Sequence, residues 1–332
     1  MVVALADRDL ARCQVVADRF GIRGRFADLG TLLDRCPVDV VGVLVPPAEH
    51  LAVAREALER GVAVLVEKPL ALSLDEADRF VEAAGASSVP TMMGFPMRWH
   101  SLVRRVREIV RGGSLGRLES IHALWNSPRD DENLPAWRSH RPRGGGALIE
   151  LAVHHFDLWR FLLDTEVVEV HARSHHGSRD DEAAVVTALL ANGMLASASF
   201  SERTSHGMEI DVRGDRGRLR MSGQRFDGLR TFAIQETDGG VRPRLRHLRD
   251  AIFDLPRGLA HMRWLGDYGD SYRAEWQHFV DAIRSGSAPE CTFEDGRAAL
   301  RIALAAAASA TRGEPVAVQA APRTIVAARS PK

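Results

Sequence analysis

The chain has 332 residues, of which 45% are hydrophobic and 27% charged, a composition typical of a globular protein. This length exceeds what one ordinary hydrophobic core organises, so we expect two domains. Lysine plus arginine equal aspartate plus glutamate at 44 each, so no net charge favours binding to nucleic acid or to an acidic membrane.

Three cysteines, Cys13, Cys36 and Cys291, are too few and too widely spaced for a disulfide framework or a metal site, and they fit a reducing compartment. No apolar stretch approaches the ~18 residues of a membrane-spanning helix, and the first residues lack the basic flank of a targeting signal. We therefore expect a cytoplasmic protein that binds neither membranes nor nucleic acid.

Short apolar runs alternate with helical patterns up to about residue 95. Strands and helices that alternate in this way indicate right-handed crossovers and a parallel sheet, so we predict an α/β domain over residues 1–95. The expected strands are Val2–Ala6, Val38–Val45, Val62–Val66 and Thr91–Gly94, and the expected helices are Asp9–Phe20, Glu49–Arg60 and Ser73–Ala84.

The pattern changes after Pro96, where several strand-like segments follow one another. Asn192-Gly193 is a strong hairpin turn, and successive hairpins predict a largely antiparallel sheet in an α+β domain over residues 96–320. Residues 223–269 look irregular, and residues 321–332 look like a disordered tail. The expected strands are Leu118–Trp125, Val167–Ser174, Ala183–Leu190, Met194–Ser201, Met208–Arg213 and Arg218–Met221, and the expected helices are Val103–Arg111, Ala147–Leu163, Tyr272–Arg284 and Phe293–Arg312.

Four arginines, Arg242, Arg244, Arg246 and Arg249, stand close together in the segment that looks irregular. We interpret them as a solvated face of the protein. A patch that binds phosphate or a partner is the alternative.

Glu67-Lys68-Pro69 stands at the end of the apolar run Val62–Val66. The run is rich in β-branched residues, which favours a strand, and Pro69 prevents the strand from continuing. Ligands bind at the carboxyl ends of strands in open parallel sheets, so we expect Lys68 to face a crevice. An ordinary lysine that pairs with Glu67 on a loop is the alternative.

Glu150, His154 and Asp157 recur at spacings of four and three within the predicted helix Ala147–Leu163, and therefore lie on one face of it. His155 points about 100° away, and we expect it to be structural. A glutamate and a histidine at this spacing could also form half of a metal site. No third ligand has a clear spacing, so we expect no bound metal.

Taken in order, these features resemble the Gfo/Idh/MocA family of nicotinamide-dependent oxidoreductases. The resemblance covers nearly the whole chain, from Val2 to about Val318. Each motif is weak on its own, but their order and spacing together are specific. The matching residues are Asp7, Pro46-Pro47, His50, Glu67-Lys68-Pro69, Arg98, Trp137-Arg138, Gly144-Gly145-Gly146, Glu150, His154, Asp157, Tyr272, Phe279-Val280, Thr292 and Glu294-Asp295-Gly296.

The resemblance implies a Rossmann-like parallel sheet followed by an α+β domain with a largely antiparallel open sheet. It also implies a homodimer or homotetramer, because relatives pair such sheets across a two-fold axis. The expected activity is hydride transfer between a hydroxyl of a sugar, inositol or related polyol and nicotinamide. The alternatives are NAD-assisted cleavage of a glycoside and a non-catalytic relative that binds a ligand or partner. A non-catalytic protein need not keep Lys68, Glu150 and His154, so these residues favour an enzyme.

Oxidising an alcohol removes a hydride from carbon and a proton from oxygen in one place. By resemblance, Lys68 would hold the substrate hydroxyl through a charge-assisted hydrogen bond as alkoxide character develops. His154 is the candidate proton acceptor, since the ordinary pKa of histidine lies near working pH. Glu150 would orient the His154 ring or bind a substrate hydroxyl. The other expected substrate-binding residues are Trp137, Arg138 and Asp157.

NAD is the expected cofactor, with NADP as the alternative. Asp7 ends the first strand, where a carboxylate can accept hydrogen bonds from ribose hydroxyls, and this favours NAD. Arg8 next to it could instead meet the 2′-phosphate of NADP. The other expected cofactor-binding residues are Pro46, Pro47, His50, Glu67, Lys68, Pro69 and Arg98.

Two features depart from the family pattern. The G-x-G-x-x-G turn, whose helix amino terminus holds the pyrophosphate, is missing, and Gly21-Ile22-Arg23-Gly24 follows a helix and cannot replace it. We therefore expect weak NAD binding, on the order of millimolar or none. In addition, Glu150 stands where the family commonly has aspartate, which moves the carboxylate by roughly 1.5 Å.

The missing strand would be central, so its two neighbours would lie about 10 Å apart with unpaired backbone. Three explanations stay open: the protein begins upstream of Met1, the two parts of the sheet close up, or the chain is a decayed relative. An intact mass equal to that of residues 1–332 would exclude the first explanation.

Overall fold

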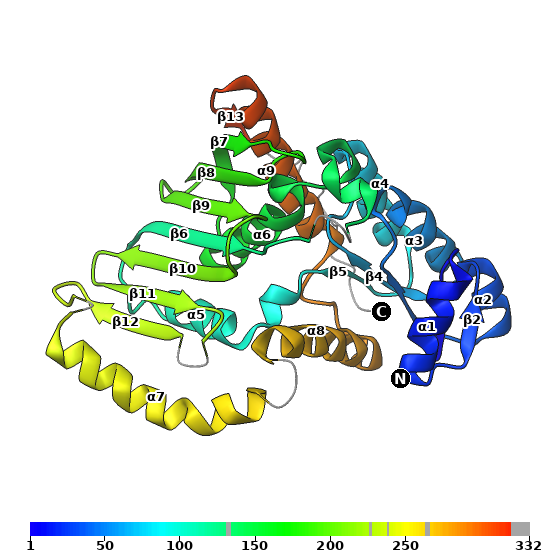
Figure 1. Ribbon diagram of the computed structural model, residues 1–332, viewed down its shortest axis with the longest axis horizontal. Helices are drawn as coiled ribbons and strands as arrows, with labels where there is room; N and C mark the ends of the chain where they lie inside the picture. Colours follow the sequence, from blue (N-terminus) through cyan, green and yellow to red (C-terminus); the bar gives the residue numbers. More distant parts are fainter. Residues whose placement is uncertain (131–133, 226–227, 238, 263–265, 320–332) are drawn as a thin grey trace, which may run out of the picture.

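The computed structural model describes residues 1–130, 134–225, 228–237, 239–262 and 266–319. Two parts lie side by side (Figure 1): small parallel sheets with flanking helices come from the start of the chain, and a large, mostly antiparallel sheet follows. The predicted fold class is confirmed. We call residues 1–95 the first part and residues 96–319 the second part. That boundary stays a prediction, and the predicted tail at 321–332 lies outside the described residues.

Strands and helices alternate through the first part, and every element predicted there is found with ends that differ by a few residues. β2 and α2 are additional: with three and seven residues they are too short to show a hydrophobic period. The elements are β1 (Ala4–Ala6), α1 (Leu10–Phe20), β2 (Gly24–Phe26), α2 (Leu29–Arg35), β3 (Val40–Val43), η1 (Pro47–Glu49), α3 (His50–Glu59), β4 (Ala63–Glu67), α4 (Leu74–Ala86) and β5 (Thr91–Gly94).

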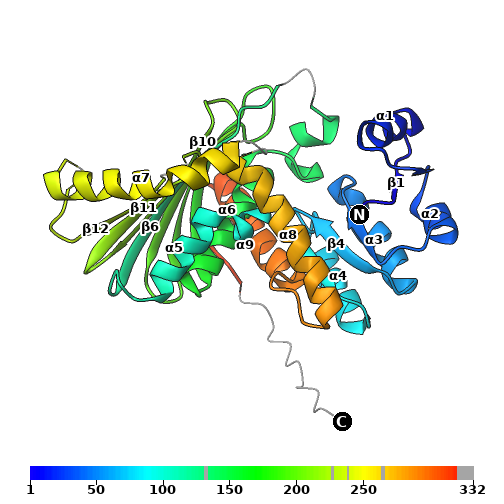
Figure 2. The same ribbon diagram turned by 90° about the horizontal axis from the view of Figure 1, so that it is seen from below.

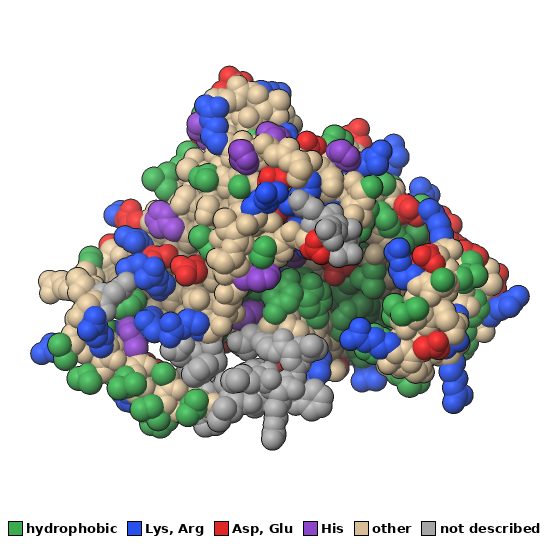
Figure 3. Space-filling model, in the orientation of Figure 1, with side chains coloured by type: hydrophobic (Ala, Val, Ile, Leu, Met, Phe, Trp, Pro, Cys, Tyr) green, Lys and Arg blue, Asp and Glu red, His purple; other side chains and the backbone are tan. Residues whose placement is uncertain are grey.

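The strands of the first part form two separate sheets. β1 pairs with β2, and β3, β4 and β5 form a second sheet, with all pairs parallel. Within the described residues, β1 and β3 are each paired along one edge only, so the two parts of the sheet do not close up. Val2 and Val3 just before β1, and Leu44 just after β3, are exposed. Figure 3 shows hydrophobic side chains in a hollow between α1 and the second part.

The second part contains an eight-stranded sheet in the order β12-β11-β10-β6-β9-β8-β7-β13. β6 and β9 are parallel and all other neighbours are antiparallel, with the predicted turn at Asn192-Gly193 between β8 and β9. The elements are η2 (Pro96–Trp99), α5 (Ser101–Arg111), β6 (Leu118–Asn126), η4 (Ala136–Ser139), η5 (Arg141–Arg143), η6 (Ala147–Leu151), α6 (Ala152–Leu163), β7 (Val167–His175), β8 (Ala183–Leu190), β9 (Leu195–Ser201), β10 (Gly207–Gly214), β11 (Gly217–Ser222), β12 (Leu229–Ala233), α7 (Val241–Met262), α8 (Gly266–Ser285), α9 (Phe293–Arg312) and β13 (Val316–Ala317).

The prediction of an irregular segment at 223–269 is wrong, because this segment contains β12, all of α7 and the start of α8. Pro243 lies in the first turn of α7, where the missing N–H costs no helical hydrogen bond. Arginines alternate with leucines after it, and this hides the apolar period in a plain scan of the sequence.

Helices α5, α6 and α9 pack their apolar side chains against one face of the large sheet (Figure 2). Its other face is open, and Val185, Leu189 and Leu195 are exposed on it. Helix α9 also packs against α4 and β5, so it joins the two parts. Among the described helices, none combines the length and the apolar character that crossing a bilayer requires.

Candidate active site

Lys68 lies at the carboxyl end of β4, directly after a strand whose residues Val64, Leu65 and Val66 are buried. The Lys68–Pro69 peptide bond is cis. The Lys68 ammonium donates to the carbonyl oxygen of Glu150 over 3.0 Å and lies 3.7 Å from the Glu150 carboxylate. Glu67 accepts from the backbone N–H of Lys68 over 3.1 Å. The lysine side chain, 13% exposed, is therefore directed at the second part.

The glycine triplet allows Glu150 to reach Lys68. A Cβ on Gly145 would lie 2.1 Å from the carbonyl oxygen of Arg138, and Gly146 has a φ of +81°. The chain then enters a π-helical turn, η6, where the N–H of Ala152 bonds to the carbonyl of Ala147, before α6 begins. Glu150 lies in this turn and not in the regular helix that the sequence predicts.

Three cations surround the carboxylate of Glu150. One oxygen accepts from Arg129 over 2.8 Å and lies 3.3 Å from a guanidinium nitrogen of Arg138, in addition to its approach to Lys68. Burial opposes ionisation of Glu150, but Lys68, Arg129 and Arg138 together lower its pKa below the ordinary value. Glu150 is therefore an ionised carboxylate at neutral pH.

His154 is buried between aromatic rings, with centroids 4.9 Å from Trp125 and 6.0 Å from Phe95. Burial, followed by the charges of Lys68 and His155, lowers the pKa of His154 well below that of free histidine. The ring is therefore neutral at neutral pH. Burial likewise lowers the pKa of Lys68, which makes this lysine a better proton donor than a surface lysine.

His155 lies where the sequence predicts a structural histidine. Its ring packs against Trp125 and Phe200, and burial lowers its pKa to about 3.

Arg98 and Asp157 lie together but away from Glu150. Arg98 donates two hydrogen bonds to Asp157, at 2.8 and 2.5 Å, and a third to Asp295 at 3.2 Å. It also donates to the carbonyl of Glu290 at 3.2 Å. The pair is buried, and it ties η2 and α6 to the start of α9. This geometry gives no support to the expected cofactor role of Arg98 or the substrate role of Asp157.

His50 joins two loops at the strand ends. Its ring nitrogens lie 3.0 Å from the carbonyl oxygen of Pro69 and 2.8 Å from that of Val45. Both partners are acceptors, so a neutral ring donates to one of them. Pro46 precedes η1 and Pro47 begins it, in the loop that His50 ties to Pro69. His50 therefore positions the loop that carries Lys68.

The residues at the end of β1 fit the ribose end of NAD in part. Asp7 accepts from the N–H of Asp9 over 2.8 Å through one oxygen. Arg8 forms an ion pair with Glu49, so its guanidinium is already engaged by a carboxylate. This engagement weakens the argument for NADP.

The pyrophosphate of NAD has no cradle among the described residues. The amino terminus of α1 is capped by Asp9. That of α4 is capped by Ser73 and has Asp75 and Glu76 in its first turn, which repel an anion. The loop before α3 begins with two prolines, which have no N–H to donate. Asp7 thus fits the ribose of NAD, and these three helix ends do not fit its phosphates.

Two charged residues of the site were not predicted. Arg129 and Glu202 lie just after β6 and β9, which are parallel neighbours, and the N–H of Arg129 donates to the carbonyl of Glu202 over 2.9 Å. Burial, followed by the nearby Glu150, raises the pKa of Glu202 to about 7. Charged residues directly after two strands are the signal that could have found them, but the parallel pairing of β6 and β9 is not visible in the sequence.

Helix α8 contributes another buried acid. Glu275 is buried, and burial, followed by the charge of Glu67, raises its pKa to about 9. Tyr272 and Tyr268, about one and two turns before it, stack edge to face at 5.6 Å. The charge of Glu67 helps to raise the pKa of both tyrosines, so this face of α8 lies near Glu67.

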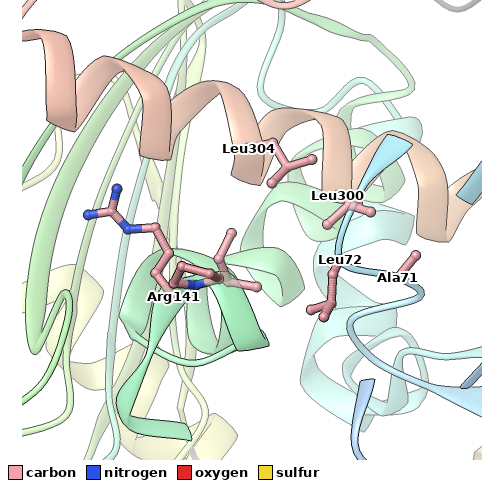
Figure 4. A pocket seen from close by; sticks show the side chains of 7 residues that line it. Ala71, Leu72, Arg141, Leu300 and Leu304 are labelled. Carbon is pink, nitrogen blue, oxygen red and sulfur yellow. The ribbon is translucent and has the colours of Figure 1, made fainter. Parts of the chain in front are cut away.

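A larger cavity, of about 380 Å³, lies at the Arg98–Asp295 network and not at Lys68. The cavity beside the site, of about 120 Å³, is lined by Ala71, Leu72, Ile149, Leu300 and Leu304, with Arg141 at its side (Figure 4). It is too small and too apolar for a sugar. Trp137 is half-buried, and the guanidinium of Arg138 lies 5.1 Å from its ring. Among the described residues, no group of three or more histidine, cysteine or acidic side chains could hold a metal ion.

Comparison with protein families gives two matches. The NAD-binding Rossmann fold of the Gfo/Idh/MocA oxidoreductase family matches residues 1–95, and the C-terminal α/β domain of the same family matches residues 107–318.

Individual relatives are similar along most of their length. The chain is 27% identical to the myo-inositol 2-dehydrogenase of Thermotoga maritima over 92% of this chain and 87% of the relative. It is 30% identical to the dTDP-3,4-didehydro-2,6-dideoxy-alpha-D-glucose 3-reductase of Streptomyces antibioticus over 87% of each. A levoglucosan dehydrogenase solved with NADH and L-sorbose shares the fold, with a TM-score of 0.81 at 23% identity over 96% of this chain and 90% of that one.

Proposed function

The chain belongs to the Gfo/Idh/MocA family of NAD-binding oxidoreductases, and we propose that it transfers a hydride between a hydroxyl of a sugar, inositol or related polyol and NAD. Relatives named for inositol and sugar-nucleotide substrates support this substrate class. The single observation that carries the proposal is that Lys68, from the first part, approaches Glu150 in the second part. There the charge of Lys68 also helps to lower the pKa of His154.

The charge states of these residues suit alcohol oxidation. NAD, when bound, supplies the hydride acceptor. The neutral His154 ring has a lone pair that can take the hydroxyl proton, and a charged Lys68 can donate a hydrogen bond to the oxygen as negative charge develops there. Protonation of His154 beside a charged Lys68 is unfavourable, so the proton must leave again after each turnover. The ionised Glu150 holds Lys68 through its carbonyl and carboxylate oxygens.

Removing Lys68 tests this proposal. Lys68→Met keeps most of the apolar stem but loses the ammonium, and we expect NAD-dependent oxidation of inositols and aldoses to fall at least 100-fold. Arg55→Met on α3 is the control, because it removes one exposed cation without touching the site. Unchanged turnover in Lys68→Met, with normal turnover in the control, would remove Lys68 from the mechanism.

A non-catalytic sugar-binding protein is the second candidate. The amino termini of α1 and α4 favour this candidate, because both are capped by side chains and offer no site for the phosphates of NAD. Sugar binding by calorimetry, without hydride transfer at millimolar NAD, would support this candidate over the dehydrogenase.

We also propose that two copies pair through the open face of the large sheet, in the cytoplasm. The exposed Val185, Leu189 and Leu195 give this face an apolar centre, and the three cysteines are free, which fits a reducing compartment. Leu195→Glu should convert the protein to a smaller species in sedimentation velocity. An unchanged mass would exclude this face as the interface.

A further inference from the structure

Glu202 lies beside the site in a place that the proposed mechanism does not use. It follows β9 directly and is buried, and one of its carboxyl oxygens, Oε1, forms no hydrogen bond with the residues that the structure describes. Buried carboxyl groups normally have hydrogen-bond partners. An oxygen without one can accept a hydrogen bond from a neighbour that moves toward it.

The backbone fixes Glu202 next to Arg129. β6 and β9 are parallel neighbours, and their pairing continues past both strand ends. The N–H of Ser127 donates to the carbonyl of Ser201 over 2.9 Å, and the N–H of Arg129 donates to the carbonyl of Glu202, also over 2.9 Å. The N–H of Glu202 in turn donates to the carbonyl of Glu182 over 2.8 Å. The backbones of Arg129 and Glu202 therefore cannot separate without breaking the end of the sheet.

The guanidinium of Arg129 lies between two acids. Its Nη2 donates to Oε1 of Glu150 over 2.8 Å, whereas its Nε lies 3.6 Å from Oε1 of Glu202. The first contact is a hydrogen bond, and the second is an ion-pair distance without a hydrogen bond. Arg129 is thus held by Glu150 and lies within reach of Glu202.

The charges that face Glu202 come from several elements. They are Arg129 after β6, Arg179 and Glu182 before β8, Glu150 in η6 and Lys68 after β4. Burial, followed by the charge of Glu150, raises the pKa of Glu202 to about 7, and the cations lower it. Arg179 lies 3.5 Å from Oε2 of Glu202 and belongs to this set. Glu202 therefore changes its charge near neutral pH, while Glu150 stays ionised.

We propose that Glu202 is a positioning residue, which competes with Glu150 for Arg129 and thereby sets how tightly Glu150 holds Lys68. Its effect on catalysis rests on the proposed function. While Glu202 is neutral, Arg129 holds the Glu150 carboxylate, which lies 3.7 Å from the Lys68 ammonium. When Glu202 is ionised, Arg129 turns toward it, and Glu150 can pair more closely with Lys68. The ammonium is then stabilised and less available to a substrate hydroxyl.

Amine labelling tests this coupling without any turnover. Lys68 and Lys332 are the only two lysines in the sequence, so acetylation of Lys68 can be followed by mass spectrometry with Lys332 as the internal reference. Only an uncharged amine reacts. Glu202→Gln is neutral at every pH, so its Lys68 should react at the wild-type rate at pH 6 and about threefold faster than wild type at pH 8.5. A ratio of the two rates that is the same at both pH values would overturn the proposal.

Three further variants separate the possible causes. Glu202→Asp keeps an ionisable group and should follow wild type at both pH values. Glu59→Gln, which removes an exposed carboxylate on α3, should do the same. Arg129→Gln removes the group for which the two acids compete, so in that background Glu202→Gln should change the rate at pH 8.5 by less than about 1.5-fold. An undiminished effect there would mean that Glu202 acts on Lys68 by its charge alone, and would overturn the positioning role.

The pH dependence of kcat/KM tests the catalytic consequence separately. For NAD-dependent oxidation of an inositol or aldose, the ratio of kcat/KM in Glu202→Gln to that in wild type should rise about threefold between pH 6 and pH 8.5. Glu202→Asp should keep the wild-type profile. If labelling shows the coupling but no variant oxidises these substrates, the proposed function fails and the coupling of Glu202 to Lys68 stands. An active enzyme with the same profile in Glu202→Gln and wild type would overturn the role of Glu202.

Discussion

Lys68 and Arg129 act on the pKa of both Glu150 and His154. Burial is the main cause that lowers the pKa of His154, and the two cations lower it further, whereas at Glu150 cationic charge lowers the pKa against the effect of burial. A positive charge stabilises a carboxylate and destabilises a protonated imidazole, so the same cations lower the pKa of both residues. As a result, Glu150 is charged and His154 is neutral. Burial adds to the effect on His154 and opposes it on Glu150. At neutral pH the site therefore contains a neutral His154, which can accept a proton, and an ionised Glu150, which can pair with Lys68.

Removing the charge of Lys68 should raise the pKa of His154, because protonation of the ring then meets less repulsion. The measurement is a pH titration of ¹³C-labelled histidine by NMR in wild type and Lys68→Met, with the His154 signal assigned by its loss in His154→Gln. Arg55→Met, far from the ring on α3, should leave the titration where it is. A His154 titration that does not move in Lys68→Met would show that the two side chains do not sense each other.

Glu275 should make the protein less stable as pH rises. The folded state keeps the proton up to about pH 9, whereas the unfolded chain releases it near 4.5. The unfolded state thus binds fewer protons between these values, and the free energy of unfolding falls as pH rises through that window. The free energy of unfolding of Glu275→Gln, measured relative to wild type, should therefore increase by about 4 kcal/mol between pH 5 and pH 8.

Urea unfolding of both proteins at the two pH values measures this gain. Glu59→Gln on α3, where the carboxylate is exposed, is the matched control and should show no gain. If the difference in the free energy of unfolding between Glu275→Gln and wild type is the same at pH 5 and pH 8, Glu275 does not hold a proton in the folded state.

The places of Lys68 and His154 in the fold, a strand end and a helix, could be predicted from the sequence, and their roles stay predictions. Arg129, Glu202 and Glu275 could not, since their roles come from contacts between segments far apart in the chain. Arg98 and Asp157 fit the family pattern, yet the structure engages them with each other. A motif identifies a residue type at a position, but the direction in which the side chain points depends on packing.

Among the helices and strands, length and regularity decide what the sequence reveals. Helix α9 is predicted to the residue because Thr292 and Asp295 form a capping box at one end and Gly313 takes a left-handed conformation at the other. Helix α7 is missed because its stripe faces outward and is interrupted by arginines. The π-helical turn η6 is also missed, since one additional residue per turn leaves no mark on hydrophobic periodicity.

Gly145→Ala tests whether the glycine triplet places Glu150. The new Cβ would lie 2.1 Å from the carbonyl oxygen of Arg138, so the chain must move, and both Arg138 and Glu150 move with it. We expect a loss of about 1–3 kcal/mol in the free energy of unfolding and a fall in turnover.

Gly85→Ala, inside α4, is the matched control. Nothing lies within 4 Å of the Cβ that it adds, and alanine should stabilise the helix by about 0.5–1 kcal/mol. Chemical denaturation and initial rates measure both variants. If Gly145→Ala and Gly85→Ala have equal free energies of unfolding, a glycine is not needed at position 145 for the close approach to the Arg138 carbonyl.

At the scale of the whole molecule, helix α9 packs against α4 and β5 and so holds the β3–β5 sheet against the second part. The unit of β1, α1, β2 and α2 is joined to that sheet by fewer contacts, among them the ion pair of Arg8 with Glu49 and that of Arg60 with Asp34. The missing central strand could be recognised in the sequence, because the expected first strand and its glycine turn are absent from the pattern. Whether the sheets would close up could not, because that depends on how the helices around them pack.

The same separation leads to a prediction about NAD. With no helix amino terminus to receive the pyrophosphate, the chain should bind NAD with a dissociation constant on the order of millimolar, or not measurably. Nicotinamide mononucleotide should bind within about threefold of NAD, because the phosphates and adenosine gain little in this structure. Titration calorimetry with both ligands measures the ratio. Micromolar NAD binding, or a large preference for NAD over the mononucleotide, would mean that the described residues rearrange to form the missing phosphate site.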